Sequence, residues 1–482
     1  MSGRIRVRFS GLLMFAGNLT TLATGLVFNV LIARNLEPAE LGVWFFIGSV
    51  IPYFQVLERV VPYWSVMEIS RGHAVGRTAV VFNLLVSLPI ASAFALLSGV
   101  LADVIGTEQR TVALAALLLP LYYVISALTS VTYSTEPHRL GLRTLVIDGV
   151  KIPLALALLP FGLEGVIAAV VIANAAYVVY LYSVSRKYFE GDLDWEWLKG
   201  SLRRAWLPLH ENFIGYLTAA TDSVIVGVLL SSDDLSRYGI GLTIAGVVGT
   251  AKALMSAVFP ALLRSGTVSP SELRALFKFI HVFTTPMVVG GIALAPQLVE
   301  IFGTRYLPAA SALPFLLLVP AIGVMSLTMR SIVAGLEVAE GGTTGKGLVR
   351  SALFVTQLPG YLYLGGLVFG TVVAVGWAGI TGAAVARLSA SVVSFVPMLY
   401  LYRKRAPAIT VLSGLEKTVP ASLVMVTVLL LLNPRGTLFT LGTIAVGALV
   451  YFSVLLLIDR DSRALTRRAI SEARSVILSV GE

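Results

Sequence analysis

The chain has 482 residues, of which 57% are hydrophobic and only 13% are charged. A soluble domain has roughly 45–50% apolar and about 25% charged residues, so this composition excludes a water-soluble enzyme, a disordered protein and a disulfide scaffold. The chain contains no cysteine and 4 histidines. Disulfides and thiolate chemistry are therefore excluded, and little is left for a metal centre.

The apolar residues gather in long continuous stretches that match the length of membrane-spanning helices, about 20 residues each. These stretches cover residues 9–33, 41–67, 78–101, 112–134, 144–161, 163–185, 207–230, 238–263, 276–302, 309–334, 346–369, 372–402, 415–432 and 437–458. They do not show the apolar–polar alternation of barrel strands, and helices satisfy their own backbone polar groups in lipid. The sequence therefore predicts an all-α polytopic membrane protein with about 14 transmembrane helices.

The chain has a net charge of +10, and the positions of its cations indicate that this charge reflects membrane topology. With the N-terminus in the cytoplasm, most Lys and Arg residues outside the spans lie in inner loops and the two tails. The outer loops contain Arg34, Arg110, Arg237, Arg305 and Arg435. This asymmetry satisfies the positive-inside rule. We therefore expect a multi-pass protein of the plasma membrane with both termini cytoplasmic, and no nucleic-acid partner.

Two local patterns occur twice, and in each case the copy lies six predicted spans later. The first pattern covers residues 31–42 and 227–239, and the second covers residues 162–169 and 376–384. Because six is even, the two halves have the same orientation in the membrane. This is the pattern of two six-helix lobes related by a pseudo-twofold axis along the membrane normal, with two further helices at the C-terminal end.

These repeats predict four parts of the chain. They are an N-lobe at 1–185, an interfacial linker at 186–206, a C-lobe at 207–402, and helices 13 and 14 with a basic amphipathic tail at 403–482. The linker mixes acidic and basic residues with tryptophan and leucine, which is typical of a helix that lies in the membrane surface.

Five short motifs resemble those of one transporter family in their order and spacing. They are residues 33–44, 222–227, 259–262, 302–310 and 379–386. Together they resemble the oligosaccharide flippase (polysaccharide transporter) branch of the multidrug/oligosaccharidyl-lipid/polysaccharide exporter superfamily. The resemblance implies two six-helix bundles facing a central cavity, and movement of lipid-linked sugars after cytoplasmic assembly. Two departures from the family pattern limit what the resemblance implies about the substrate. Ser223 stands where the family often has a basic residue, and residues 55–60 replace a commoner segment that resembles Asp-Leu-Gly.

Ionisable residues inside the spans are the candidates for a functional site, because a charge in the bilayer costs several kcal/mol unless it faces protein or water. The predicted cationic, substrate-binding set is Arg59, Lys252, Arg387 and Arg330. Arg59 and Lys252 lie at similar distances beyond the repeated glycines Gly42 and Gly239. We therefore expect them to face one cavity from opposite lobes and to hold a lipid diphosphate.

The acids of the spans form a predicted charge network of Glu58, Asp148, Glu211 and Asp222. Asp148 and Lys151 are three residues apart, so they share a helical face and are expected to form a structural pair. Glu211 and Asp222 share a face of the seventh helix, where they could couple H⁺ or Na⁺ movement or hold the cavity cations. A cation-coupled drug exporter is often expected to carry a carboxylate in its first helix. Residues 9–33 contain no acid, which favours an anionic amphiphile over a cationic drug as the substrate.

The predicted function is a flippase that moves a polyprenyl- or dolichyl-diphosphate oligosaccharide from the cytoplasmic to the outer leaflet by alternating access, for polysaccharide or glycan biosynthesis. The alternatives are a cation-coupled multidrug exporter of the same superfamily and a structural membrane scaffold. The sequence contains no Ser-His-Asp set and no large outer loop, so no enzyme activity, metal or cofactor is expected. The expected partners are the lipid-linked oligosaccharide and membrane lipids, with the protein acting as a monomer.

Overall fold

The computed structural model describes residues 20–189, 192–255, 269–339, 351–460 and 462–463. These residues are almost entirely helical and include no strand. The first helix covers residues 20–35 of the described chain. The helices that follow are α2 (Pro38–Phe54), α3 (Val60–Ser70), α4 (Gly76–Ile105), α5 (Gln109–Leu114), α6 (Leu118–Thr135), α7 (Arg143–Leu158), α8 (Gly162–Ser185), α9 (Trp195–Arg203), α10 (Trp206–Leu229), α11 (Ser232–Gly249), α13 (Pro270–Ala293), α14 (Ala295–Glu300), α15 (Leu313–Ala339), α16 (Ala352–Val355), α17 (Leu358–Arg403), α18 (Leu415–Leu432) and α19 (Thr437–Ile458).

Short 3₁₀ segments join or extend many of these helices. They are η1 (Ala115–Leu117), η2 (Pro137–Leu142), η3 (Leu159–Phe161), η4 (Arg186–Tyr188), η5 (Thr250–Met255), η6 (Thr304–Ser311) and η8 (Ala408–Leu412). Local sequence explains several helix ends. Ser269 and Glu272 form a capping box at the start of α13, with Pro270 in its first turn, and Gly106 ends α4 in a left-handed conformation with φ 73°.

Nine helical stretches of the described residues are long and apolar enough to cross a membrane. The predicted fold class, an all-α multi-pass membrane protein, is therefore confirmed. Two of the nine, Pro137–Tyr188 and Leu358–Arg403, each contain a break that divides them into two helices. The figure of about 14 spans stays a prediction, as do the inward placement of both termini and the plasma membrane.

The two breaks share an unusual backbone geometry. Gly162 has φ 59° and ψ −144°, and Gly379 has φ 53° and ψ −134°, a region open mainly to glycine. Three residues later, a Cβ on Gly165 or on Gly382 would lie 2.0 Å from a backbone carbonyl oxygen of the preceding helix. The second repeated sequence pattern thus folds into the same turn twice, as an internal repeat requires.

The chain divides into two compact units. The first unit contains Met1–Thr243 and Gln357–Ser394, and the second contains Ile244–Thr356 and Phe395–Glu482. These units do not coincide with the lobes expected at 1–185 and 207–402, so the predicted division into lobes, linker and tail stays a prediction.

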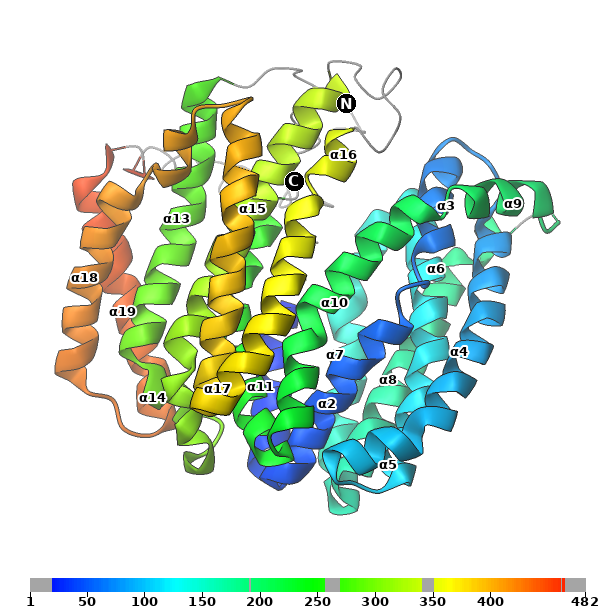
Figure 1. Ribbon diagram of the computed structural model, residues 1–482, viewed down its shortest axis with the longest axis horizontal. Coiled ribbons are helices and arrows are strands. Elements are labelled where there is room, and N and C mark those ends of the chain that lie inside the picture. Colours follow the sequence, from blue (N-terminus) through cyan, green and yellow to red (C-terminus); the bar gives the residue numbers. More distant parts are fainter. Residues whose placement is uncertain (1–19, 190–191, 256–268, 340–350, 461, 464–482) are drawn as a thin grey trace, which may run out of the picture. The chain divides into compact units, whose positions relative to one another are not determined.

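In the first unit, α4, α6, α7 and α8 pack side by side (Figure 1). Elsewhere in this unit α2 contacts the end of α10 and the start of α11 at three glycines. A Cβ on Gly42 would lie 1.8 Å from the carbonyl oxygen of Ser232, and one on Gly239 would lie 2.3 Å from the ring of Phe45. A Cβ on Gly227 would lie 2.8 Å from the ring of Phe46. The backbones meet here because no side chain separates them.

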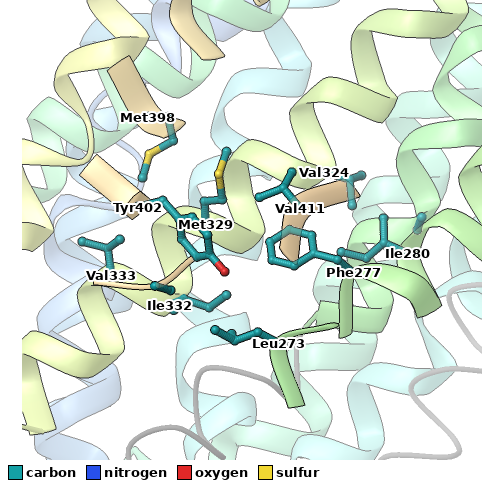
Figure 2. Close-up of a cluster of buried hydrophobic side chains, with 12 residues drawn as sticks. Leu273, Phe277, Ile280, Val324, Met329, Ile332, Val333, Met398, Tyr402 and Val411 are labelled. Atoms are coloured by element: carbon teal, nitrogen blue, oxygen red, sulfur yellow. The ribbon is translucent and has the colours of Figure 1, made fainter. Parts of the chain in front are cut away.

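The second unit has its own apolar core, which Figure 2 shows in close-up. Its side chains come from α13, α15, the end of α17 and η8, and include Phe277, Met329, Tyr402 and Val411. The hydroxyl of Tyr402 lies 2.7 Å from that of Thr410, so the polar end of this buried ring is satisfied.

Candidate functional site

The predicted second span, residues 41–67, is not one helix. The helix α2 ends at Phe54, α3 begins at Val60, and the five residues between them form turns. In this segment the N–H of Glu58 donates to the carbonyl of Gln55 at 2.9 Å, and the N–H of Val60 donates to that of Leu57 at 3.2 Å. We call residues 55–59 the helix break. Broken helices of this kind form ligand and ion sites in transporters.

Three side chains from neighbouring helices bind the carbonyl oxygens that the break removes from the helical ladder. The hydroxyl of Tyr123 (α6) donates to Phe54 O at 2.7 Å. The amide of Asn212 (α10) donates to Val56 O at 3.1 Å. The amide of Asn83 (α4) donates to Glu58 O at 2.8 Å. Irregular backbone at membrane depth is stable only where protein or water satisfies it, so these donors hold the break in place.

The break contains the charged neighbours Glu58 and Arg59. Glu58 is buried and accepts a hydrogen bond from the hydroxyl of Tyr216, and its Oε1 lies 3.3 Å from Arg59 Nε. The guanidinium carbon of Arg59 lies 5.8 Å from the centre of the Tyr216 ring. The Arg59 side chain is 63% exposed, whereas the Glu58 side chain is buried. The carboxylate therefore orients the arginine through Nε, and most of the guanidinium stays open to a ligand.

A second charged cluster of the first unit joins α10, α11 and α17. The Asp222 side chain is fully buried, and its Oδ2 accepts hydrogen bonds from the Tyr238 hydroxyl and from Arg387 Nη1. The Arg387 side chain is 13% exposed. The sequence singled out both charged residues, and the structure places them against each other in a buried ion pair.

The expected pair of Asp148 and Lys151 is present in α7, with 2.5 Å between Oδ1 and Nζ. Lys151 Nζ also lies 4.5 Å above the centre of the Phe28 ring, and the Thr24 hydroxyl donates to Asp148 Oδ2. Both contacts come from the helix at residues 20–35. This cluster therefore ties the first described helix to α7, which is a structural role.

The remaining predicted site residues are Glu211, Lys252 and Arg330. Glu211 lies on α10, half-buried and within electrostatic range of Tyr63. Lys252 lies in η5 of the second unit with its side chain exposed, and Arg330 lies on α15 of that unit, half-buried. The expectation that Arg59 and Lys252 face one cavity stays a prediction. Among the residues that the structure describes, no group of three or more His, Asp or Glu side chains could hold a metal ion.

Sequence reasoning missed the uncharged donors of the break. Asn212 and Tyr216 are four residues apart on α10, so they lie on one face of that helix. Asn83 is fully buried within the long apolar helix α4. A buried amide in an apolar helix is the one sequence signal that could have marked this place, since such a group needs a partner.

Solved transporter structures share this arrangement of helices. The structure of the lipid II flippase MurJ in an inward closed conformation matches with a TM-score of 0.73 and 14% identity, over 94% of this chain and 99% of that chain. A Vibrio cholerae MATE transporter matches with a TM-score of 0.57 and 16% identity, over 82% of this chain and 95% of its own. A MOP superfamily transporter from Pyrococcus furiosus matches with a TM-score of 0.52 and 14% identity, over 82% of this chain and 95% of its own.

Sequence comparison identifies the family more narrowly than the fold does. Residues 30–311, more than half of the chain, match the family described as polysaccharide biosynthesis protein, and the chain belongs to this family. No curated protein sequence matches the chain. The resemblance inferred from the five motifs is thus confirmed: the chain belongs to a polysaccharide biosynthesis family, and it shares its fold with solved structures of the superfamily.

Proposed function

We propose that this protein is a flippase that moves a lipid-linked oligosaccharide from the cytoplasmic to the outer leaflet of the plasma membrane. Two comparisons support the proposal: the polysaccharide biosynthesis family, and a fold shared with a lipid II flippase over nearly the whole chain. The observation that carries it is the exposed guanidinium of Arg59 at the helix break.

In this proposal Arg59 binds the diphosphate that links the sugar to its lipid. A guanidinium donates two parallel charge-assisted hydrogen bonds to phosphate oxygens, which fixes orientation as well as affinity. Glu58 keeps its bond to Nε, so the two terminal nitrogens remain for the ligand. Lys252 and Arg330 are retained as further cationic contacts. The bound head group then crosses by alternating access while its lipid tail stays in the bilayer.

The acids have two different roles in this proposal. Asp222 and Arg387 neutralise each other and hold three helices together. Glu58 and Glu211 remain the candidates for coupling to H⁺ or Na⁺. A cation-coupled multidrug exporter is the second candidate, because the MATE transporters share the fold. Such an exporter would need an open carboxylate for a cationic drug, whereas Glu58, Asp148 and Asp222 are buried and already paired.

The test is the lipid-linked sugar pool of a strain that lacks this gene, measured by mass spectrometry of extracted lipids. We expect a complete lipid-diphosphate oligosaccharide to accumulate on the cytoplasmic side. The wild-type gene should restore the pool and Arg59→Glu should not, although the variant is inserted at the normal level. Arg435→Glu, an exposed arginine far along the chain, is the matched control and should restore it. An unchanged pool with new sensitivity to cationic drugs would instead favour the exporter.

A further inference from the structure

The short helix α9 differs from the other helices of the first unit in direction and in composition. It lies across the ends of α3 and α4 instead of running parallel to them (Figure 1). One of its faces is anchored: Leu198 is buried against Val61 and Ala79. The N–H of Asp194, just before the helix, donates to the Thr78 hydroxyl at 2.9 Å. The helix is therefore fixed to the cytoplasmic side predicted for these ends.

The adjacent face of α9 exposes large apolar side chains together with cations. Trp195 is 54% exposed and Leu202 is 40% exposed, and Lys199 and Arg203 are exposed between and beside them. The spacing of four, three and one residues places all four on one face of a helix. We call these four residues the α9 stripe. An indole and a leucine facing water are unfavourable, which indicates that this face is covered in the working protein.

The charges along α9 indicate what covers the stripe. The acidic Asp194 and Glu196 stand at the start of the helix, and the cations gather at its end. Arg204, just after the helix, stacks 4.4 Å above the Trp64 ring of α3 and donates from Nε to Gly200 O at 3.2 Å. Cations beside an exposed indole match the interfacial zone of a bilayer, where phosphates and acyl chains meet.

We propose that the α9 stripe is a binding site for anionic phospholipid of the cytoplasmic leaflet. Lys199 and Arg203 bind the phosphate of the head group, and Trp195 and Leu202 enter the region below it. Since α9 is packed on α3, and α3 begins directly after Arg59, the bound lipid steadies the helix that follows the break. This site is separate from the substrate contact and does not depend on which substrate is moved.

The test uses the purified full-length protein in neutral detergent micelles, titrated with phosphatidylglycerol or with phosphatidylcholine, with the Tm as the measurement. We expect phosphatidylglycerol to raise the Tm and phosphatidylcholine to have little effect. In the double variant Lys199→Gln/Arg203→Gln, the apparent affinity for phosphatidylglycerol should fall by roughly 30-fold, the value expected for two surface cations. Higher salt should weaken the wild-type response.

The matched control is Arg274→Gln/Arg435→Gln, which removes the same charge from exposed positions elsewhere and should leave the response unchanged. The conservative double variant Lys199→Arg/Arg203→Lys should also bind normally. Because all substituted side chains are exposed, each variant should fold, which its lipid-free Tm checks directly. Equal responses to the two lipids would overturn the proposal. An undiminished response in Lys199→Gln/Arg203→Gln would overturn it too, because the lipid would then bind elsewhere.

Discussion

The buried ion pair of the first unit gives a quantitative prediction. Replacing Asp222 by Asn removes the charge and keeps an oxygen that can still accept from Tyr238. The other carboxylate oxygen, Oδ1, has no hydrogen-bond partner among the described residues, so an amide nitrogen placed there breaks no existing hydrogen bond. What the substitution removes is the charge opposite Arg387, whose side chain is only 13% exposed.

A buried charge left without its partner costs about 3–5 kcal/mol, whereas an ordinary hydrogen bond between membrane helices contributes about 0.6 kcal/mol on average. We therefore expect Asp222→Asn and Arg387→Met each to lower the free energy of unfolding by about 3–5 kcal/mol. The double variant removes both charges together and should lose less than about 2 kcal/mol. Unfolding of all four proteins in mixed detergent–SDS micelles, followed by circular dichroism, measures these differences.

Two results would refute this reasoning. A loss below about 1 kcal/mol in Asp222→Asn would mean that the pair is not a buried ion pair in energetic terms. A double variant as unstable as the sum of the single ones would mean that the two charges do not interact. If Asp222 instead carried the coupling ion, the Asn variant would keep its stability and lose only transport.

Three further predictions concern other contacts. Tyr216→Phe removes the hydroxyl that donates to Glu58 and should cost about 1–3 kcal/mol of unfolding free energy, measured in the same SDS titration. Gly42→Ala places a methyl carbon 1.8 Å from a backbone oxygen of α11, so a loss of about 1–3 kcal/mol or more is expected in the thermal unfolding of the variant. The hydrogen bond from Lys187 holds the pKa of Glu136, which lies outside the membrane helices, below its ordinary value of 4.5. This contact therefore stabilises the protein above pH 4.5 and is lost as pH falls through the lowered pKa. The Tm of the wild type and of Lys187→Met should accordingly differ at neutral pH and converge in acid.

Two of these variants have a matched control in the chain. Gly48→Ala adds a methyl group where no atom lies within 4 Å, and it should leave the Tm almost unchanged. A Gly42→Ala protein as stable as Gly48→Ala would contradict the close approach of α2 to α11. A constant difference between Lys187→Met and wild type at all pH values would show that the lysine acts by packing alone. Tyr180→Phe loses a hydroxyl bond at the exposed surface, and Tyr216→Phe should cost more than this change.

Local spacing was enough to predict some features of the molecule. Long apolar runs predict the helices, because a chain in lipid has few other ways to satisfy its backbone. The pair of Asp148 and Lys151 follows from a spacing of three on one helix. The second repeated pattern is also visible in the sequence, and Gly162 and Gly379 in its two copies adopt nearly the same φ and ψ.

Features that depend on distant parts of the chain could not be predicted in this way. Residues 41–67 are a continuous apolar run apart from a few charges, and a single helix was the natural expectation. The break becomes stable only because Asn83, Tyr123 and Asn212 reach it from three other helices. The partner of Arg387 is 165 residues away in the sequence, and nothing in the local pattern of either residue indicates the other.

The three donors that hold the helix break have a consequence for how this protein could change its substrate. They bind backbone carbonyls at the break, so under the proposed function recognition of the substrate at this place depends on side chains, and above all on the residue at position 59. A new residue there would meet a scaffold that is already satisfied and would leave its hydrogen bonds intact. The charge preference of such a transporter could therefore drift by single substitutions without passing through unfolded intermediates.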